Sequence, residues 1–316
     1  MTLRCAVIGV GYLGKFHAQK YAALPAAELV AVVDADAQVA AGQAAALGCE
    51  ALTDYRALLD RVDAVSIATP TTLHHAIARD CLARGIHVLV EKPITTTLAQ
   101  ADELIALAEA NGCVLQVGHL ERYNAAVRAL GERLAGPPLF VESHRLAPFK
   151  PRATDVSVVL DLMIHDIDLI LNLVGAEVTD IRASGAAVLS PDIDIANARL
   201  EFANGCVANV TSSRVSQKSE RKMRLFQRDA YLAIDFQARV LDVYRKGAGE
   251  MFPGVPDIRH EVVEGGDSDA LRAEIEDFLD AIASGRPATV SGADGRRALA
   301  TAMRIGELVA QSPALG

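Results

Sequence analysis

The first 118 residues alternate between short apolar segments and longer segments with helical spacing of apolar residues. The apolar segments, which predict strands, are Arg4–Ile8, Leu29–Val33, Ala64–Ala68, His87–Val90 and Val114–Val117. The segments between them, which predict helices, are Tyr12–Ala23, Asp36–Leu47, Thr71–Arg84 and Leu98–Ala110. Such alternation is typical of a doubly wound α/β domain, in which helices cover both faces of a parallel sheet. The strand segments are apolar throughout, as expected where both faces are covered.

The pattern changes beyond a predicted helix at Glu121–Leu134, where Gly136-Pro137-Pro138 interrupts it. A strand-like stretch, Leu139–Leu146, and a long helix, Val158–Leu173, come next. Short strands separated by turns then predict an antiparallel sheet. They are Ala196–Phe202, Cys206–Val210, Met223–Phe226, Ala230–Phe236 and Val240–Tyr244, and the closing helices are Asp269–Ala283 and Ala293–Ala310. We expect a domain of residues 1–120 and an α+β domain of residues 121–316.

Charge and cysteine content exclude several classes of protein. The net charge is −9 and no segment is densely basic, so a nucleic-acid partner is not expected. No apolar run approaches the roughly 20 residues that cross a bilayer, and Met1–Gly14 is typical of a first strand rather than a signal peptide. The five cysteines are widely spaced without a C-x-x-C pair, which favours reduced thiols in a cytoplasmic protein over disulfides or a zinc site.

A glycine motif follows the first predicted strand and opens the first predicted helix. Gly9, Gly11 and Gly14 form G-x-G-x-x-G, with Tyr12 and Leu13 between the last two. Such glycines permit a tight turn, close approach of a pyrophosphate and close helix–strand packing. Twenty residues after Gly14, Asp34 ends the second strand, and no arginine follows directly. A carboxylate there accepts ribose hydroxyls and repels a 2′-phosphate, so we expect NAD rather than NADP. A plain glycine turn and a helix-capping Asp34 are the alternatives.

Two further segments carry a family resemblance. They are Ala68-Thr69-Pro70-Thr71-Thr72-Leu73-His74 and Gly85-Ile86-His87-Val88-Leu89-Val90-Glu91-Lys92-Pro93. Together with the glycine motif and His17-Ala18, they resemble the glucose–fructose oxidoreductase/inositol dehydrogenase/rhizopine catabolism (Gfo/Idh/MocA) family, over essentially the whole chain.

The resemblance implies a Rossmann domain followed by an open-faced, mainly antiparallel sheet whose free face forms homodimers or homotetramers. It also implies that Thr69 and Pro70 lie along the cofactor, with His74 and Glu91 on the cofactor side. Lys92, by the same resemblance, reaches the reacting oxygen of the substrate.

Oxidation of a secondary alcohol by hydride transfer requires a base for the hydroxyl proton and a positive group at the oxygen. Lys92 suits the second role, because ligands of open α/β sheets bind at the carboxyl ends of strands; a surface lysine near Glu91 is the alternative. Asp161 and His165 are four residues apart and would share one helix face. They match the family's D-x-x-x-H, which implies His165 as acid/base and Asp161 as its partner, meeting Lys92 at the nicotinamide.

Other readings of this acidic helix remain open. Asp161 and His165 could be a plain helix-surface ion pair, and a metal site has too few ligands to be expected. Asp168 could join the His165 face, whereas Asp166 should point elsewhere. The run Asp155–Leu160 lacks the glycines that many family members have before this helix, which indicates a differently shaped substrate pocket.

The stretch from Gly118 to Asn124 resembles the family's G-x-x-x-R-x-x-P, although Ala125 replaces the expected proline. It makes Arg122 and Tyr123 candidates for substrate binding. We expect His17 and His87 to serve packing or backbone hydrogen bonds rather than catalysis.

The resemblance implies an NAD(P)-dependent oxidoreductase that acts on a sugar or nucleotide-sugar hydroxyl. The segment from Asp155 through Asp168 is similar to bacterial members that are UDP-N-acetylglucosamine 3-dehydrogenases. Cations of the second half could meet a diphosphate: Arg145, Lys150, Arg152, Arg214, Lys218, Arg221, Lys222 and Arg224. The alternatives are an NAD(P)H-dependent reductase of a ketone, imine or tetrapyrrole, and a non-catalytic NAD-binding regulator.

Overall fold

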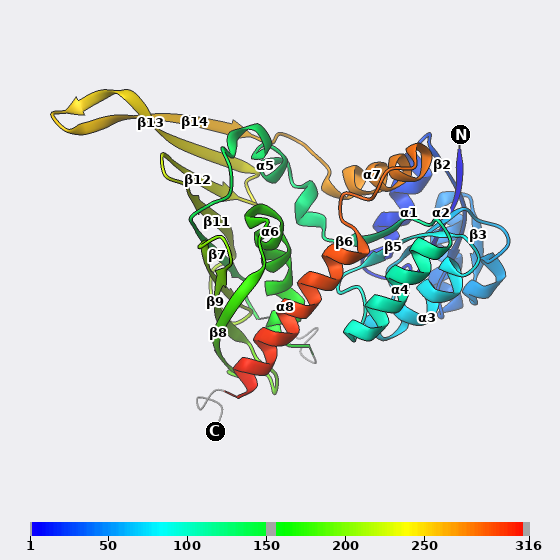
Figure 1. Ribbon diagram of the computed structural model, residues 1–316. Helices are drawn as coiled ribbons and strands as arrows, with labels where there is room; N and C mark the ends of the chain where they lie inside the picture. Colours follow the sequence, from blue (N-terminus) through cyan, green and yellow to red (C-terminus); the bar gives the residue numbers. More distant parts are fainter. Residues whose placement is uncertain (1, 150–155, 312–316) are drawn as a thin grey trace. The chain divides into compact units, whose positions relative to one another are not determined.

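The computed structural model describes residues 2–149 and 156–311, which form two compact units (Figure 1). The first unit combines the residues up to Leu120 with Asp269–Arg296. The second combines Glu121–Ser268 with the residues from Arg297 onward. The division expected from the sequence, 1–120 and 121–316, differs from this grouping in residues 269–296. They pack with the first unit because Ile275 and Phe278 are buried against its core.

The first unit contains a six-stranded parallel sheet with strand order β3-β2-β1-β4-β5-β6. Its strands are β1 (Leu3–Ile8), β2 (Ala27–Val33), β3 (Glu50–Leu52), β4 (Ala64–Ile67), β5 (His87–Glu91) and β6 (Leu115–Gly118). All four residues of β4 are buried, as expected for a central strand covered on both faces. The predicted doubly wound domain is confirmed.

Five helices belong to the sheet of the first unit: α1 (Gly14–Ala23), α2 (Ala37–Leu47), α3 (Thr71–Leu82), α4 (Leu98–Ala110) and α7 (Ala270–Ser284). Local sequence signals begin and end them. The side chain of Asp36 accepts hydrogen bonds from the first turn of α2, and Asp269 does the same for α7. Both helices end at a glycine with positive φ, Gly48 and Gly285.

The second unit contains an eight-stranded sheet with strand order β14-β13-β12-β11-β7-β10-β9-β8. Every pairing is antiparallel except that of β7 with β10. The strands are β7 (Phe140–Leu146), β8 (Val178–Ala186), β9 (Ile195–Phe202), β10 (Val207–Ser213), β11 (Glu220–Phe226), β12 (Ala230–Asp235), β13 (Val240–Phe252) and β14 (Val255–Glu264). The expected mainly antiparallel sheet is therefore confirmed.

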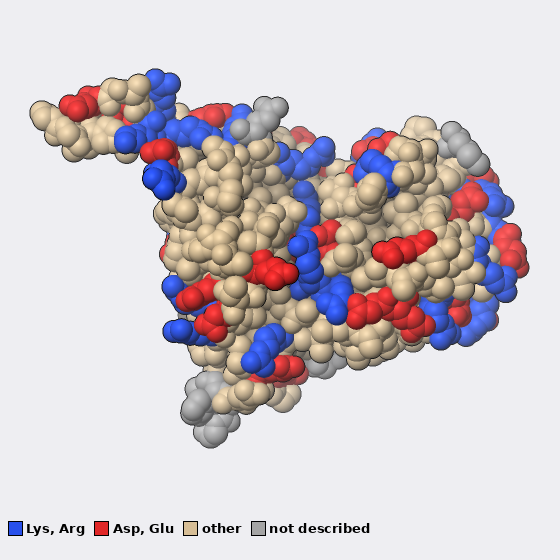
Figure 2. All heavy atoms as spheres, in the orientation of Figure 1, with Lys and Arg blue, Asp and Glu red and all other residues tan. Residues whose placement is uncertain are grey.

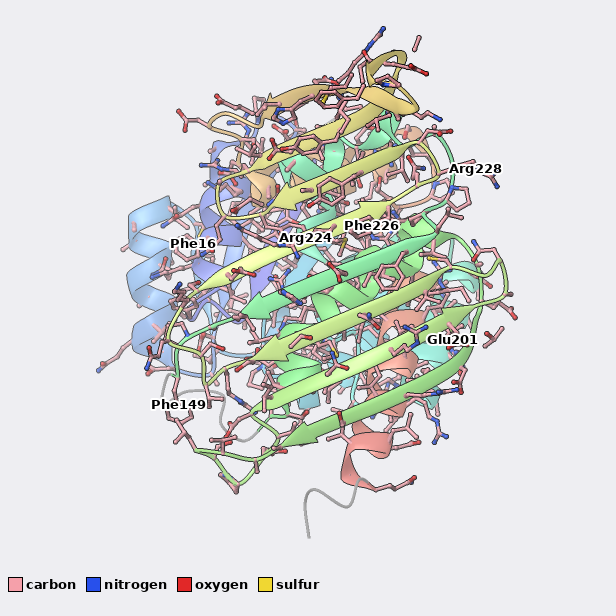
Figure 3. All side chains as sticks on the ribbon, turned by 90° about the vertical axis from the view of Figure 1, so that its left-hand side faces the viewer. Phe16, Phe149, Glu201, Arg224, Phe226 and Arg228 are labelled. Carbon is pink, nitrogen blue, oxygen red and sulfur yellow. The ribbon has the colours of Figure 1, made fainter. Side chains whose placement is uncertain are left out.

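One face of this sheet is buried by α6 (Ile164–Val174) and by the later turns of α8 (Gly292–Ala310). The strands alternate accordingly, so that in β11 Met223 and Leu225 are buried while Arg224 and Phe226 face the other side. Figure 3 views that other face, on which side chains stand without a covering helix. The β13–β14 hairpin continues beyond β12, which pairs only with Val240–Arg245 (Figure 1).

Two predicted helices of the second unit differ from expectation. The helix expected at Glu121–Leu134 is a 3-10 turn η2 (Leu120–Tyr123), a single turn α5 (Ala125–Arg128) and a second 3-10 turn η3 (Gly131–Arg133). Asn124 divides it, because its side chain accepts a hydrogen bond from the Ala126 N–H and caps a new turn. The long helix expected at Val158–Leu173 begins instead with a π-helical turn, η4 (Val159–Met163), before α6.

Acidic and basic side chains are interspersed over the face shown in Figure 2. Among the helices that the structure describes, none has both the length and the apolar character needed to cross a membrane. All five cysteines are described and are free thiols.

Candidate active site

The glycine loop between β1 and α1 has a shape that only glycine allows at two positions. Gly9 has φ +84°, and a Cβ there would lie 2.8 Å from the carbonyl oxygen of Ala68. A Cβ on Gly14 would lie 1.7 Å from the carbonyl oxygen of Gly9, so α1 begins directly against the loop. Gly11, in contrast, faces open space within 4 Å of its Cβ position. The loop therefore leaves room for a pyrophosphate at the start of α1.

Asp34 lies at the end of β2, next to this loop. Its Oδ2 accepts a hydrogen bond from the Val10 N–H at 3.0 Å, and its Oδ1 accepts one from the Asp36 N–H at 3.0 Å. Asp36, not Asp34, caps α2. The carboxylate of Asp34 is thus fixed by the backbone, and its remaining lone pairs can accept the hydroxyls of a ribose.

His74 connects the two other segments that the sequence places at the cofactor. Its Nε2 lies 2.9 Å from the carbonyl oxygen of Thr69, and its Nδ1 lies 3.0 Å from that of Pro93. Burial lowers the pKa of His74, although the surrounding carbonyl groups oppose this effect. His74 is 1% exposed and links these two segments, and its place on the cofactor side stays a prediction. The side-chain oxygen of Thr69 is buried without a hydrogen-bond partner among the described residues, as expected of an atom that awaits a ligand.

Glu91 and Lys92 lie at the carboxyl end of β5, the edge of the sheet to which the glycine loop also belongs. Oε1 of Glu91 lies 3.1 Å from Nε2 of His17, and Oε2 accepts the Lys92 backbone N–H at 3.3 Å. Burial by itself would raise the pKa of Glu91, but the hydrogen bond with His17 and the electrostatic interactions with His17 and Lys92 hold it below its ordinary value. Glu91 is therefore an anion beside Lys92.

His17 belongs to a chain of buried hydrogen bonds that sequence reasoning missed. Its Nδ1 lies 3.2 Å from Oγ of Ser66, which in turn lies 2.8 Å from the hydroxyl of Tyr21. We expected packing or backbone contacts for His17, and its partners are instead two side chains. The sequence could have indicated these partners, because His17 lies three residues after Gly14. It is therefore one helical turn into α1, on the side that faces the sheet.

In the second unit, Asp161 lies in the π-helical turn η4, and His165 lies in the first turn of α6. Both side chains are partly buried. A π-helical turn bonds i to i+5 and recurs at functional sites. Asp161 and His165 thus lie in two consecutive helical segments rather than in one α-helix, and their pairing stays a prediction.

Arg122 forms a buried ion pair with Asp168 of α6. Its Nε and Nη2 donate to the two carboxylate oxygens at 2.7 Å each, and its Nη1 donates to Oδ1 of Asn172 at 2.7 Å. Asp168 is three residues after His165 in α6, and both of its carboxylate oxygens accept hydrogen bonds from Arg122. Arg122 thereby anchors α6 from η2, and its contact with substrate stays a prediction, as does that of the buried Tyr123.

A second buried arginine anchors α6 from the sheet. Arg145 of β7 donates to both carboxylate oxygens of Asp166, at 2.8 and 3.1 Å, and to Glu121 at 2.9 Å. Asp166 therefore does point elsewhere, as expected. Two of the cations considered for a diphosphate, Lys150 and Arg152, lie outside the described residues, as does Asp155.

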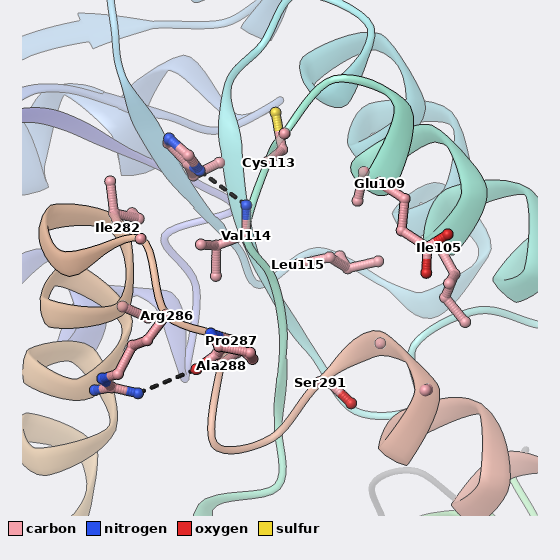
Figure 4. Close-up of a pocket in the computed structure, with 17 residues that line it drawn as sticks. Ile105, Glu109, Cys113, Val114, Leu115, Ile282, Arg286, Pro287, Ala288 and Ser291 are labelled. Atoms are coloured by element: carbon pink, nitrogen blue, oxygen red, sulfur yellow. Dashed lines mark hydrogen bonds between the residues drawn. The ribbon is translucent and has the colours of Figure 1, made fainter.

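Other features of the described residues do not resemble a reaction centre. A cavity of about 440 Å³ in the first unit is lined by α4, β6 and the segment between α7 and α8 (Figure 4). It lies by His87 at the amino end of β5, the opposite edge from the glycine loop, and Nδ1 of His87 accepts the Val114 N–H there. Burial raises the pKa of Cys5 and of Cys81 to about 12, which makes them poor nucleophiles. No cluster in the described part of the chain has the ligands for a metal ion.

The fold and the glycine loop define a dinucleotide-binding oxidoreductase. Comparison with known proteins agrees: residues 3–119 match the model of the oxidoreductase family with an NAD-binding Rossmann fold, and residues 123–232 match the GFO/IDH/MocA C-terminal domain. The chain belongs to the Gfo/Idh/MocA family of oxidoreductases. The predicted family, enzyme class and NAD cofactor are confirmed.

Individual relatives include a UDP-N-acetylglucosamine 3-dehydrogenase of Acidithiobacillus ferrooxidans, 48% identical over 303 residues that cover 96% of each chain. A crystal form of that enzyme superposes with a TM-score of 0.93 over 98% of each chain, at 47% identity. An NAD-dependent scyllo-inositol 2-dehydrogenase of Bacillus subtilis is 31% identical over 68% of each chain. A levoglucosan dehydrogenase in complex with NADH and levoglucosan, at 22% identity and TM-score 0.88, shares the fold.

Proposed function

We propose that this protein oxidises the C3 hydroxyl of UDP-N-acetylglucosamine with NAD. The observation that carries the proposal is the 48% identity to a UDP-N-acetylglucosamine 3-dehydrogenase, which spans both units rather than the cofactor half alone. The same chain retains a glycine loop, a fixed Asp34 and a Glu91–Lys92 pair at one edge of the parallel sheet.

In this proposal Gly9, Gly11 and Gly14 hold the pyrophosphate with the exposed N–H groups at the start of α1, including those of Tyr12 and Leu13. Asp34 accepts the ribose hydroxyls, and Thr69 and Pro70 lie along the cofactor. NAD, when bound, accepts the hydride from the sugar carbon.

Side chains of the protein assist the transfer of the proton from the substrate hydroxyl. The ammonium of Lys92 donates a hydrogen bond to the hydroxyl oxygen and stabilises the negative charge that develops there as the proton leaves. The imidazole of His165 takes that proton as general base, and Asp161 sets its orientation. Arg122 and Tyr123 shape the substrate site from η2. The direction of proton transfer reverses if the enzyme runs as a reductase.

The test is formation of NADH from UDP-N-acetylglucosamine and NAD, with the 3-keto product identified by mass spectrometry. We expect Lys92→Ala and His165→Ala to lower kcat by at least about 100-fold, the usual loss when a general base is removed. Exposed Lys246→Ala on β13 is a matched control and should retain activity. Binding of NAD without turnover of any sugar would favour a non-catalytic regulator, and reduction of a ketone or imine with unchanged Lys92→Ala activity would favour the reductase.

We also propose that two copies associate through the outer face of the eight-stranded sheet, as a homodimer or as half of a homotetramer. A row of rings crosses this face: Phe140, Phe226, Tyr231, Tyr244 and His260, with centroids of neighbours 4.2–6.0 Å apart. Phe226 stands in the middle of the face, beside Arg224, which pairs with Glu142 (Figure 3). Rings and charges of both signs on one face suit a self-complementary interface. Light scattering should show Phe226→Glu as a monomer; an unchanged mass would contradict the proposal.

We also propose a cytoplasmic location, because free thiols at all five cysteines are typical of a protein in a reducing compartment.

A further inference from the structure

A cluster of polar residues, most of them buried, lies on the face of the six-stranded sheet that α1 and α7 cover. Ser66 of β4 and Gln116 of β6 both pair with Leu89 of β5, and side chains of residues paired in this way point to the same face. Leu89 packs there against Ile275 and Phe278 of α7. Glu91, two residues after Leu89, points to this face too. The cluster consists of His17, Tyr21, Ser66, Glu91, Gln116 and Glu274.

One half of the cluster is fully connected. Hydrogen bonds run from Tyr21 through Ser66 and His17 to Glu91, whose other oxygen accepts the Lys92 N–H. The chain thus ends at the residue that, in the proposed function, acts on the substrate oxygen.

The other half is not connected. Glu274 of α7 has no exposed surface, and neither oxygen of its carboxyl group has a hydrogen-bond partner among the described residues. The side-chain oxygen of Gln116 is likewise buried and unpaired within the described chain, while its Nε2 donates to the backbone carbonyl of Glu274 at 3.1 Å. Burying an ionised carboxylate without a donor costs far more free energy than burying a protonated one, so this environment favours the neutral acid.

The surrounding charges act in the same direction. Burial raises the pKa of Glu274 well above its ordinary value, and the negative charges of Glu91 and Asp277 raise it further. The hydroxyl of Tyr21 also interacts with Glu274, and burial raises the pKa of this hydroxyl. Among the described residues, the interactions with His17 and Lys92 that lower the pKa of Glu91 are not among the causes that shift the pKa of Glu274.

We propose that Glu274 and Glu91 form a pair of carboxyl groups that holds a single negative charge, with the proton on Glu274 and the charge on Glu91. Glu274 is then a positioning residue for the proposed hydride transfer, and it acts through Glu91. The neutral acid keeps a second anion away from Glu91, so that the Glu91 carboxylate stays bound to His17 and keeps Lys92 in place. This role rests on the proposed function, whereas the protonation state of Glu274 does not.

The protonation state is tested by thermal unfolding of the full chain as a function of pH, with the variant Glu274→Gln. In the unfolded chain Glu274 ionises near its ordinary pKa, so above that pH folding must take up one proton and the wild type loses stability as pH rises. Glutamine takes up none. We expect the Tm of Glu274→Gln to rise relative to wild type between pH 5 and 8 by about 2 °C per pH unit.

Glu276→Gln is the matched control, because Glu276 is half-exposed on the same helix and pairs with Arg272. Its Tm difference from wild type should not grow with pH. A flat difference for Glu274→Gln as well would overturn the assignment of the proton.

The coupling to Glu91 is tested by repeating the comparison in the Glu91→Gln background. Without the charge on Glu91 the proton on Glu274 is held less tightly, so the gain from Glu274→Gln at pH 8 should shrink. An unchanged gain would show that the two carboxyl groups do not interact, which overturns the pair.

The positioning role is tested by the pH profile of kcat. Loss of the proton from Glu274 should lower wild-type kcat on the alkaline side, and Glu274→Gln should shift this fall upward by at least one pH unit, with the KM for NAD within about twofold. An unshifted profile would overturn the positioning role. Absence of sugar oxidation in the wild type would overturn the proposed function and the positioning role together, while the unfolding experiment would still decide the proton.

Discussion

Arg122 and Asp168 of α6 form a two-pronged ion pair, with two N–O distances of 2.7 Å and with 6% and 1% of their side chains exposed. This pair joins the turn η2 to α6, the helix whose first turn contains His165. A buried carboxylate that loses its partner is strongly destabilising, whereas an exposed ion pair contributes little.

We therefore expect Arg122→Ala to lower the free energy of unfolding of the second unit by about 3–5 kcal/mol. The control is Arg304→Ala, because Arg304 and its partner Glu307 are more than half exposed, and this change should cost less than about 1 kcal/mol. Urea unfolding followed by circular dichroism measures both. Equal effects of the two variants would contradict a structural role for the Arg122–Asp168 pair.

Two glycine-to-alanine changes, one in the glycine loop and one in α2, should have opposite outcomes. Gly14→Ala places a methyl group 1.7 Å from the carbonyl oxygen of Gly9, so the loop must shift, and kcat/KM for NAD should fall by about 100-fold or more. Gly42→Ala lies within α2 with open space around it, and it should stabilise the protein by about 0.5–1 kcal/mol without affecting NAD. Steady-state kinetics and thermal unfolding distinguish them. Retention of NAD kinetics in Gly14→Ala would show that the loop is not the cofactor site.

Asp34 and Asp36 allow cofactor recognition and helix capping to be separated. Asp34→Ala removes the acceptor of the ribose hydroxyls and should raise the KM for NAD about 10- to 100-fold, with weaker discrimination against NADP. Asp36→Ala removes the cap of α2 and should cost about 1 kcal/mol of stability while leaving the NAD/NADP ratio unchanged. The ratio of kcat/KM for the two cofactors is the measurement. A changed ratio in Asp36→Ala alone would reverse the assignment.

The burial of His74 predicts that the protein loses stability as the pH falls below neutrality. Burial lowers its pKa in the folded protein, so below the ordinary histidine pKa the unfolded chain binds a proton that the folded protein excludes. The stability linked to neutral His74 is present above that pH and is lost as pH falls through the folded pKa. Between pH 7 and 5 the Tm of wild type should therefore fall more steeply than that of His74→Gln. Parallel curves would mean that His74 is not held neutral.

Much of the cofactor half could be read from residues close together in sequence. The glycine spacing, the aspartate twenty residues later and the apolar strands are local patterns, and each specifies a local geometry that the structure reproduces. The helix expected at Glu121–Leu134 failed for a local reason too, because Asn124 offers the backbone a competing hydrogen bond. Apolar periodicity, on which that expectation rested, does not register a single capping side chain.

The residue pattern and motif spacing along the chain were enough to predict the two kinds of sheet. They also predicted the dinucleotide-binding loop and the family. The pairing of charges was decided by tertiary structure alone. Arg122 with Asp168, Arg145 with Asp166 and His17 with Glu91 join residues 21 to 74 positions apart, and the burial that gives each pair its strength exists only after folding. The environment of Glu274 shows this most clearly, because the sequence does not distinguish an exposed glutamate from a buried one.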